Sequence, residues 1–295
     1  MNERDRVQER ARSLQQERVP YVHARVVLAE RPTSAKPGDE ALVLGDGTME
    51  GFVGGTCAES TVRAQSLTLL DSGETLLLRI APEEEDQIPG KLTVVNPCLS
   101  GGTIEIFLQP VIPAPVVAVL GDTPIARSLL ALGTALGYEL VPWGTIDVRG
   151  AAAVVVASHG RDEEDALEAA LRAGVPYVGL VASRRRGESV VASLHEGAPD
   201  RARVHTPAGI DIGARTAEEV ALSILAEIVA SRPRPSARAV SGPESSAVDT
   251  AVDPVCGMAV AMVDSSLHYD HAGTRRWFCG SGCLRAFAAD PDAYV

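Results

Sequence analysis

The sequence predicts an α/β protein with three parts: an N-terminal α+β domain, a Rossmann-like domain with a doubly wound sheet, and a small C-terminal module of the metal-binding type. Three observations support this class. The chain has 295 residues, more than one compact domain usually holds. Apolar strand-like segments alternate with helical segments over residues 113–231, as in a mostly parallel sheet covered by helices. Five of the eleven aromatic residues and three of the five cysteines lie after residue 250, which indicates a separate unit there.

The charge and the apolar content exclude several classes of protein. Hydrophobic residues make up 45% of the chain, so a sizeable core is available. The formal net charge is −12, which disfavours a nucleic-acid binder because phosphate binding needs a basic surface. The first residues lack the apolar run of a signal peptide, and no apolar run reaches the roughly 18 residues of a membrane span. We therefore expect a cytoplasmic protein without a membrane span.

Residues 1–112 form the predicted N-terminal domain. A polar helical pattern covers 5–16, and the segment 103–108 alternates apolar and polar residues as a half-buried strand does. Glycines cluster at 45–55 and at 101–102, where we expect loops. The other strand-like segments cover 21–28, 40–43 and 74–80.

Residues 113–231 form the predicted Rossmann-like domain. A buried strand over 115–121 leads to Thr123, which suits a helix N-cap, and then to Pro124, which suits the first helical position. The segment 216–219 has the spacing of a capping box and opens a last amphipathic helix. The other expected elements are strands over 152–157 and 176–181 and a helix over 162–173.

A linker over residues 232–250 is rich in Pro, Ser and Ala and leads to the C-terminal module, residues 251–295. The module is near the size at which a core alone is marginal, and a bound metal is a common remedy. Cys279 and Cys283 are four residues apart, so on a helix their thiols share one face and can converge on one ion with Cys256. Five cysteines in a cytoplasmic chain also favour metal or thiol chemistry over disulfides. The sequence thus predicts a soft-ligand site for zinc or copper.

The fourth ligand of this metal site stays open at the level of the sequence. The alternatives are His268, His271, Asp253 and water. A different interpretation makes the three cysteines small apolar residues of a tiny core, which explains their clustering less well.

Two further segments, 51–59 and 96–102, place a cysteine beside paired glycines. Small residues let backbone N–H groups approach an anionic or bulky ligand closely. The alternative is a pair of tight turns with incidental buried cysteines, and the chemistry alone slightly favours it. The candidate cofactor-binding residues in these segments are Gly54, Gly55, Cys57, Glu59, Cys98, Gly101 and Gly102.

The Rossmann-like domain carries candidate ligand contacts at the ends of its strands, where ligands of such folds bind. The turn at Gly121 lacks the pattern Gly-x-Gly-x-x-Gly, which disfavours a nicotinamide dehydrogenase. Cations at 184–186 follow the strand over 176–181, although a solvated charge run explains them equally well. His159 and Asp211 have loop or capping roles as their alternative. The candidate residues are His159, Ser183, Arg184, Arg185, Gly209 and Asp211.

Together these segments resemble the XdhC/CoxI family of accessory proteins for molybdenum hydroxylases. Residues 51–59 and 98–102 match its two glycine–cysteine motifs, with Thr56 where glycine is usual. At 121–124 the sequence Gly-Asp-Thr-Pro departs from the family's Gly-Ala-Gly-His. Three later segments also match: the strand end at 183–185, the loop at 205–213 and the last helix at 216–228.

The resemblance implies a maturation chaperone that holds the molybdenum cofactor, which is of the molybdopterin type. Such a protein keeps the cofactor during its sulfuration and hands it to an apo molybdenum hydroxylase of the carbon monoxide dehydrogenase or xanthine dehydrogenase type. A cysteine desulfurase is then a further partner. Arg184 and Arg185 suit the anionic part of the cofactor, and Cys57 or Cys98 would lie near its metal. The sequence leaves open whether the chain forms a homodimer.

The C-terminal module resembles the YHS domain, a family often attached to heavy-metal transport and handling proteins. The match includes Asp-Pro-Val-Cys-Gly-Met at 253–258, Trp-Phe-Cys-Gly-Ser-Gly-Cys at 277–283 and Asp-Pro-Asp-Ala-Tyr at 290–294. Carbon monoxide dehydrogenases of the molybdenum type carry copper beside molybdenum. The two resemblances together therefore imply that the module delivers, holds or senses copper for such a client.

Two other functions remain as alternatives. No catalytic acid, base or activated nucleophile stands out in the sequence, so a binding role is favoured over an enzymatic one. The competing function is that of an oxidoreductase or sulfur-transfer enzyme that uses Cys57 or Cys98, and a persulfide trapped on either cysteine would support it. The third is a metal-homeostasis protein whose main part is the C-terminal module.

Overall fold

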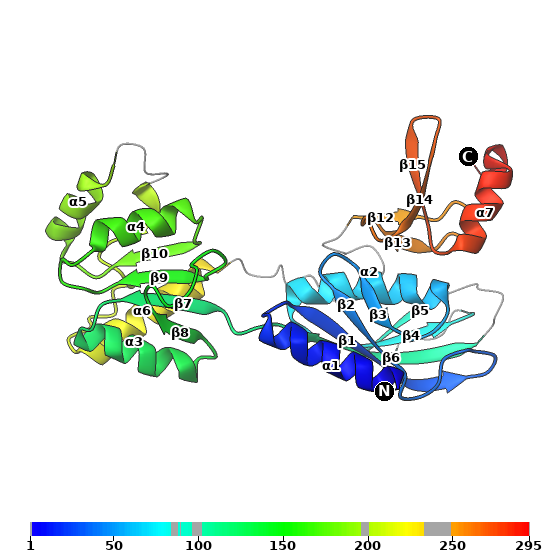
Figure 1. Cartoon of the computed structure of the whole chain (residues 1–295), viewed down its shortest axis with the longest axis horizontal. Coiled ribbons are helices and arrows are strands. Elements are labelled where there is room, and N and C mark those ends of the chain that lie inside the picture. The colour runs from blue at the N-terminus through cyan, green and yellow to red at the C-terminus, as the bar shows by residue number, and fades with distance from the viewer. Residues whose placement is uncertain are drawn as a thin grey trace. The chain divides into compact units, whose positions relative to one another are not determined.

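In the computed structural model the chain divides into two compact units, shown in Figure 1. The structure describes residues 2–83, 88, 90–95, 102–195, 201–232 and 249–294. One unit combines residues 1–113 with 235–295, and the other comprises residues 114–234. The first unit thus contains the N-terminal domain and the C-terminal module, and the second is the Rossmann-like domain. The predicted α/β class, with a mixed sheet, a parallel sheet and a small cysteine-bearing module, is confirmed.

A six-stranded mixed sheet forms the N-terminal domain, in the order β3-β2-β1-β6-β4-β5. Its neighbouring strands are antiparallel except β4 and β5, which are parallel. The strands are β1 (Tyr21–Glu30), β2 (Glu40–Leu44), β3 (Met49–Gly51), β4 (Leu76–Ala81), β5 (Lys91–Val95) and β6 (Thr103–Val111). The four strand segments expected from the sequence coincide with β1, β2, β4 and β6.

Two helices cover opposite faces of this sheet, α1 (Glu3–Gln16) and α2 (Thr56–Ser72). Val22 of β1 packs in one core with Val62 of α2, whereas its neighbour Tyr21 packs in another core with Leu14 of α1. Successive side chains of a strand point to opposite faces of the sheet. The alternation within β1 therefore places each helix on its own face.

Helix α2 is an element that the apolar periodicity of the sequence does not reveal. Its buried residues include Ser60, Thr61 and Ser66, which dilute the apolar stripe. The residues at the two ends indicate the helix more clearly than its periodicity does. The helix begins after Gly55 and ends at Gly73, whose φ of 72° is typical of a left-handed C-terminal cap.

The Rossmann-like domain is built on five parallel strands in the order β11-β10-β9-β7-β8. Counted within the domain from β8, this order is 2-1-3-4-5, so the topological switch point lies between β7 and β9. The strands are β7 (Val116–Leu120), β8 (Glu139–Pro142), β9 (Ala153–Val156), β10 (Tyr177–Leu180) and β11 (Val204–His205).

Helices cover both faces of the parallel sheet. One face carries α3 (Pro124–Ala135) and α6 (Ala217–Ser231), and the other carries α4 (Glu163–Arg172) and α5 (Arg184–Ser193). The predicted capping box is confirmed at the start of α6, and the predicted N-cap is confirmed at α3, where Thr123 Oγ1 accepts the N–H of Ala126 at 3.2 Å. Among the described residues, no helix is long and apolar enough to cross a bilayer.

The C-terminal module consists of two short antiparallel strand pairs, one helix and a 3₁₀ turn. Its elements are β12 (Thr250–Val252), β13 (Ala259–Ala261), β14 (Leu267–His271), β15 (Thr274–Phe278), α7 (Ser281–Ala289) and the turn Pro291–Tyr294. Phe287 of α7 lies at the centre of an aromatic core, with its ring 5.2 Å from that of Phe278 and 6.0 Å from that of Tyr269. The aromatic residues cluster in the sequence because this core needs them.

The module packs against helix α2 of the N-terminal domain. Ala261 of β13 shares a small apolar cluster with Ala64 and Leu67 of α2. Ser265 Oγ donates a hydrogen bond to the carbonyl of Asp46 at 3.2 Å. The contact brings the beginning of α2, with Cys57, against the cysteines of the module.

Candidate functional site

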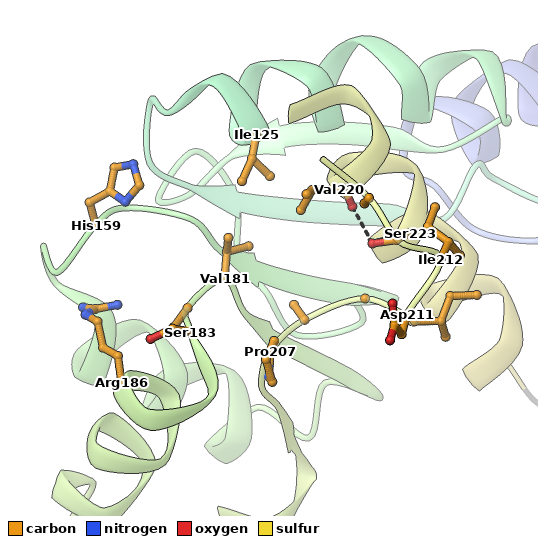
Figure 2. Close-up of a pocket in the computed structure, with 15 residues that line it drawn as sticks. Ile125, His159, Val181, Ser183, Arg186, Pro207, Asp211, Ile212, Val220 and Ser223 are labelled. Carbon is orange, nitrogen blue, oxygen red and sulfur yellow. Dashed lines mark hydrogen bonds between the residues drawn. The ribbon is translucent and has the colours of Figure 1, made fainter. Parts of the chain in front are cut away.

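A pocket of about 540 Å³ opens at the carboxyl edge of the parallel sheet in the Rossmann-like domain (Figure 2). Its walls come from α3, the loop after β9, the turn between β10 and α5, the loop before α6, and α6 itself. This edge, beside the switch point, is where open parallel sheets bind their ligands. The floor is apolar, with Ile125, Val181 and Val220 facing the cavity.

One side of the pocket is cationic. Ser183 is the N-cap of α5, and its side chain makes no capping hydrogen bond. Arg186, in the first turn of α5, lies on the same side as Ser183 and His159 in Figure 2. An uncapped helix N-terminus next to a guanidinium favours an anionic ligand.

Glu163 fixes the geometry of this cationic side. Its carboxylate accepts the N–H of Gly160 at 2.6 Å and the hydroxyl of Ser158 at 3.2 Å, and it pairs with Arg186. The Glu163 side chain is only 1% exposed, so these bonds are made in a water-poor environment. They hold a loop in which His159 has a left-handed φ of 55°, a conformation that is costly for a residue other than glycine.

The opposite side of the pocket is acidic. Asp211 and Ile212 lie there in Figure 2, on the irregular loop that precedes α6. The Asp211 carboxylate is exposed, and its Oδ1 accepts the N–H of Gly213 at 3.1 Å. The pocket therefore has a positive end, an apolar floor and a negative end.

Glu227 of α6 anchors the loop that carries the acidic side. Its carboxylate accepts the N–H of Gly209 at 2.6 Å and the hydroxyl of Tyr177 at 2.6 Å, and it lies 2.9 Å from His205 Nδ1. Burial raises the pKa of Glu227, but the hydrogen bonds from these three groups outweigh it, and the pKa is lower than usual. Burial and the neighbouring carboxylate raise the pKa of Tyr177. At neutral pH the network is therefore fixed, with Glu227 ionised and Tyr177 protonated.

The turn between β7 and α3 keeps the first glycine of a dinucleotide motif but has Thr123 and Ala126 at the positions of the other two. Gly121 has a φ of 116°, and a side chain there would collide with the carbonyl of Ala157. The next residue is Asp122, whose carboxylate pairs with Arg127 at 2.8 Å at the start of α3. Thr123 stands where a dinucleotide fold has its second glycine, and the acidic side chain of Asp122 beside it disfavours a phosphate.

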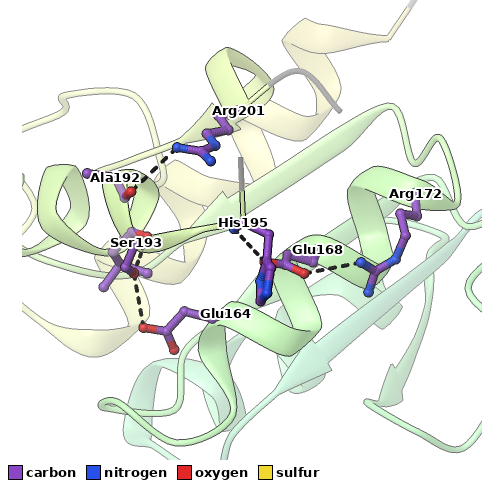
Figure 3. Close-up of polar contacts among 8 residues, drawn as sticks. Glu164, Glu168, Arg172, Ala192, Ser193, His195 and Arg201 are labelled. Carbon is purple, nitrogen blue, oxygen red and sulfur yellow. Dashed lines mark hydrogen bonds and ion pairs between the residues drawn. The ribbon is translucent and has the colours of Figure 1, made fainter. Parts of the chain in front are cut away.

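A second set of polar contacts ties α4 to the segment after α5 (Figure 3). Glu168 accepts the backbone N–H of His195 at 2.8 Å and a hydrogen bond from Arg172 at 3.1 Å. Ser193 Oγ donates to Glu164 at 3.3 Å. None of these residues lines the pocket. The bonds of Ser193 and His195 hold the end of α5, the helix whose N-terminus forms the cationic side, whereas the pairing of Arg172 with Glu168 lies within α4.

The structure brings together four of the six candidates that the sequence indicates in this domain: His159, Ser183, Gly209 and Asp211 line the pocket. Arg184 and Arg185 are exposed and are not among the lining residues. Arg186 lines the pocket instead, and nothing in the sequence distinguishes it from the other two arginines of the run. The helical turn that begins at Ser183, together with the pairing of Arg186 with Glu163, directs this arginine toward the cavity.

In the N-terminal domain Gly54, Gly55, Cys57 and Glu59 lie around the start of α2, whereas Gly102 precedes β6. Gly55 is the N-cap of this helix, and Cys57 and Glu59 lie in its first turn. Burial raises the pKa of Glu59, and the charge of Arg63 partly opposes this shift. Cys98 and Gly101 lie outside the described residues.

Two glycines of this group have a packing explanation. A side chain on Gly102 would collide with the carbonyl of Pro32, and one on Gly54 would lie 3.1 Å from Ala58 Cβ. The close packing of the domain therefore requires small residues at both positions without any ligand.

In the C-terminal module the three predicted ligands converge. Cys279 Sγ lies 3.5 Å from Cys256 Sγ and 3.7 Å from Cys283 Sγ. Asp253 joins them, and the four residues offer ligand atoms that all lie within 4.8 Å of one another. In tetrahedral zinc–thiolate sites, Zn–S bonds of about 2.3 Å imply sulfur–sulfur separations of roughly 3.8 Å. The spacing of the cysteines fits such an ion, so the cluster could bind a metal.

The electrostatics of the cluster also suit a cation. Burial and the nearby Asp253 carboxylate raise the pKa of the Cys283 thiol, and hydrogen bonding with Cys57 together with burial raises that of Cys279. Thiols that resist ionisation because anions crowd them become good ligands when a cation replaces the protons.

Two protein-family models match this chain. A model described as the XdhC Rossmann domain matches residues 117–228, and one described as the XdhC and CoxI family matches residues 14–81. Together the two models cover more than half of the chain. The chain belongs to the XdhC and CoxI family. The resemblance drawn from the sequence motifs is thereby confirmed for the N-terminal and Rossmann-like domains, and the YHS resemblance of the C-terminal module stays a prediction.

Two further proteins resemble this XdhC and CoxI family chain. The uncharacterized protein YqeB of Escherichia coli (strain K12) is 27% identical over 252 residues, which cover 74% of this chain and 45% of YqeB. The chain thus spans about half the length of that relative. A solved structure described as a xanthine dehydrogenase from Bacillus halodurans is 16% identical, with a TM-score of 0.36, over 81% of this chain and 98% of that one.

Proposed function

We propose that this chain is a maturation chaperone that binds the molybdenum cofactor in the pocket of the Rossmann-like domain. It then passes the cofactor to an apo molybdenum hydroxylase of the xanthine dehydrogenase or carbon monoxide dehydrogenase type. Family membership supports an accessory role. The observation that carries the proposal is the polarity of the pocket, with Arg186 and the N-terminus of α5 at one end and Asp211 at the other.

The cationic end of the pocket suits the phosphate of the cofactor. The uncapped first turn of α5 provides backbone N–H groups, and Ser183 adds a hydroxyl. The pairing of Arg186 with Glu163 keeps the guanidinium in a fixed direction but neutralises part of its charge. Such a site holds a phosphate firmly and still allows its release, which a protein that passes on its ligand requires.

The remainder of the pocket suits the pterin. The apolar floor made by Ile125, Val181 and Val220 offers a surface for a flat ring. The exposed carboxylate of Asp211 can accept hydrogen bonds from the amino and ring N–H groups of a pterin. A dinucleotide is a poorer fit, because its pyrophosphate would meet Asp122 at the start of α3.

The C-terminal module adds a site for a soft metal ion, zinc or copper, held by Cys256, Cys279 and Cys283. A module that handles copper is consistent with a client of the carbon monoxide dehydrogenase type. A cysteine desulfurase would supply sulfur while the chaperone holds the cofactor.

Two variants that each remove one positive charge, one inside the pocket and one outside it, test whether the cofactor binds there. Purified full-length protein is incubated with cofactor released from a molybdenum enzyme and then gel-filtered, and the retained cofactor is measured through its fluorescent oxidation product. Arg186→Gln should retain about tenfold less than the wild type, since a charge-assisted hydrogen bond is worth roughly 1.5–3 kcal/mol. Arg172→Gln, which removes a charge from α4 away from the pocket, should retain as much as the wild type. Equal retention by both variants would contradict this binding site.

A further inference from the structure

We propose that Cys57 of helix α2 supplies a fourth thiolate to the metal site of the C-terminal module, so that one soft metal ion ties the module to the N-terminal domain. Cys57 packs in the same cluster as Cys256, Cys279 and Cys283, and its thiol is hydrogen-bonded to that of Cys279. Cys57 and Cys279 are 222 residues apart in the chain, and no spacing in the sequence predicts that they meet. This inference concerns metal binding and does not depend on the pocket of the Rossmann-like domain.

The backbone holds Cys57 firmly at this position. It is the second residue of α2, and the preceding residue Thr56 lies against Gly280, where an added Cβ would come within 3.3 Å of the Thr56 side chain. Gly280 stands between Cys279 and the helix that carries Cys283. A small residue at 280 therefore lets the two elements approach until their cysteines meet.

Asp253 is a weaker candidate for the fourth ligand because both of its oxygens already accept hydrogen bonds. Oδ2 accepts the N–H of Cys279 and Oδ1 accepts the N–H of Val255, at 2.8 Å and 2.9 Å. Its side chain is fully buried. It thus shapes the loop that carries Cys256 and Cys279, and its two N–H bonds restrict how far the carboxylate can turn toward an ion.

The two histidines of the module are also poor candidates. His268 Nδ1 lies 3.2 Å from the carbonyl of Ser266, and the ring lies 5.1 Å from that of Trp277. The His271 ring packs edge-on against Phe287 in the aromatic core. The group of converging ligand atoms found among the described residues consists of Asp253 and the three cysteines of the module, so it contains neither histidine. Cys57 is not a member of this group, but it adjoins the group through its contact with Cys279.

Two helix N-termini offset the negative charge that four thiolates bring. Cys57 lies in the first turn of α2 and Cys283 in the first turn of α7. The helix dipole places partial positive charge at each of these ends and stabilises thiolates there. Four thiolates with a divalent ion leave two negative charges, to which the two dipoles are complementary.

Shared use of Cys57 would also have a functional consequence. A metal ion held by the four cysteines occupies the thiol that the family motif assigns to the cofactor.

Cobalt(II) in place of zinc tests the number of thiolates. Reduced, metal-free, full-length protein is titrated with Co²⁺, and the sulfur-to-cobalt charge-transfer absorption is measured. The wild type should bind one ion with the spectrum of a tetrahedral tetrathiolate site. Cys57→Ser should lose about a quarter of the charge-transfer intensity, as expected for three thiolates instead of four. It should also bind about tenfold or more weakly, since even the loss of a supporting partner of a metal ligand costs 10–100-fold.

Ser60→Ala is the matched control. It changes one atom of a side chain on the same helix, and the buried hydroxyl it removes has no hydrogen-bond partner in the described structure. Its cobalt spectrum should equal that of the wild type. A Cys57→Ser variant with the wild-type spectrum and affinity would overturn the proposal, as would a wild-type protein that binds no Co²⁺. Neither result bears on cofactor retention in the pocket.

Alkylation of the unmodified protein gives a second test that needs no variant. Iodoacetamide is added with and without Zn²⁺, and labelled peptides are quantified by mass spectrometry. Zn²⁺ should protect Cys57 to the same extent as Cys279 and Cys283. Protection of the module's cysteines while Cys57 reacts at its metal-free rate would also overturn the proposal.

Discussion

The carboxylate of Asp253 accepts the backbone N–H of Cys279 at 2.8 Å, and this bond joins the two segments that carry the cysteines of the C-terminal module. Because the bond is buried, its loss should cost more than that of an exposed hydrogen bond. We expect Asp253→Asn to destabilise the metal-free module by about 1.5–3 kcal/mol, since the amide cannot accept at both positions. If Asp253 only shapes the site, the cobalt spectrum should keep its form while the affinity falls.

The two tryptophans allow this effect to be measured in the full chain. Trp277 lies in the module and Trp143 in the Rossmann-like domain, so in a Trp143→Phe background the fluorescence reports on the module alone. In this background, Asp253→Asn should lower the urea concentration at the midpoint of unfolding. The control Asp292→Asn, at an exposed residue, should leave this midpoint unchanged. A spectrum changed in form by Asp253→Asn would instead make Asp253 a ligand.

Glu227 should stabilise the Rossmann-like domain in a pH-dependent way. Glu227→Gln removes the charge that three donors share, so we expect a loss of about 2 kcal/mol in the free energy of unfolding at neutral pH. The folded-state pKa of Glu227 is lowered, so its stabilisation is present above the usual glutamate pKa of about 4.3 and is lost as the pH falls through the folded value.

The difference between Glu227→Gln and the wild type should therefore shrink below about pH 4.3. Trp143 fluorescence in a Trp277→Phe background measures it, and Glu188→Gln, on the exposed surface of α5, is the control. A difference that stays constant from pH 7 to acidic pH would show that Glu227 acts by its shape alone.

The Rossmann-like domain should not bind NAD or FAD in the usual pose. The turn at Gly121 carries Asp122 and ends in the Thr123 cap, which leaves no glycine-lined space for a pyrophosphate. Isothermal titration calorimetry should detect no dinucleotide binding in the micromolar range. Micromolar binding of either dinucleotide to the wild type would contradict this expectation.

Local rules predicted much of the fold because they act within a few residues. The caps at Thr123 and Thr216 depend on side chains three positions away, and the structure has both. Helix α7 carries Cys283 in its first turn, but Cys279 precedes the N-cap Gly280, so the two thiols meet without sharing a helix face as the spacing suggested. Helix α2 was not predicted from the sequence because serines and threonines lie on its buried face and interrupt the apolar periodicity. Tertiary packing, and not an apolar stripe, stabilises this helix.

The candidate site was less predictable, because its geometry depends on contacts between distant segments. The selection of Arg186 over Arg184 and Arg185 follows from its pairing with Glu163, which lies 23 residues earlier. The meeting of Cys57 with Cys279 depends on the packing of β13 on α2. A motif identifies the residue types of a site, whereas the packing of the folded chain decides which of them share a cavity.

Retention of the molybdenum cofactor is the most direct measurement of the proposed function. Full-length protein purified from cells that make the cofactor should carry pterin and molybdenum in equal amounts, at up to one per chain. Arg186→Gln should lower both together, and Arg172→Gln should lower neither. Protein that carries no pterin from such cells, and that retains none after incubation with released cofactor, would contradict the role of this chain as a molybdenum cofactor chaperone.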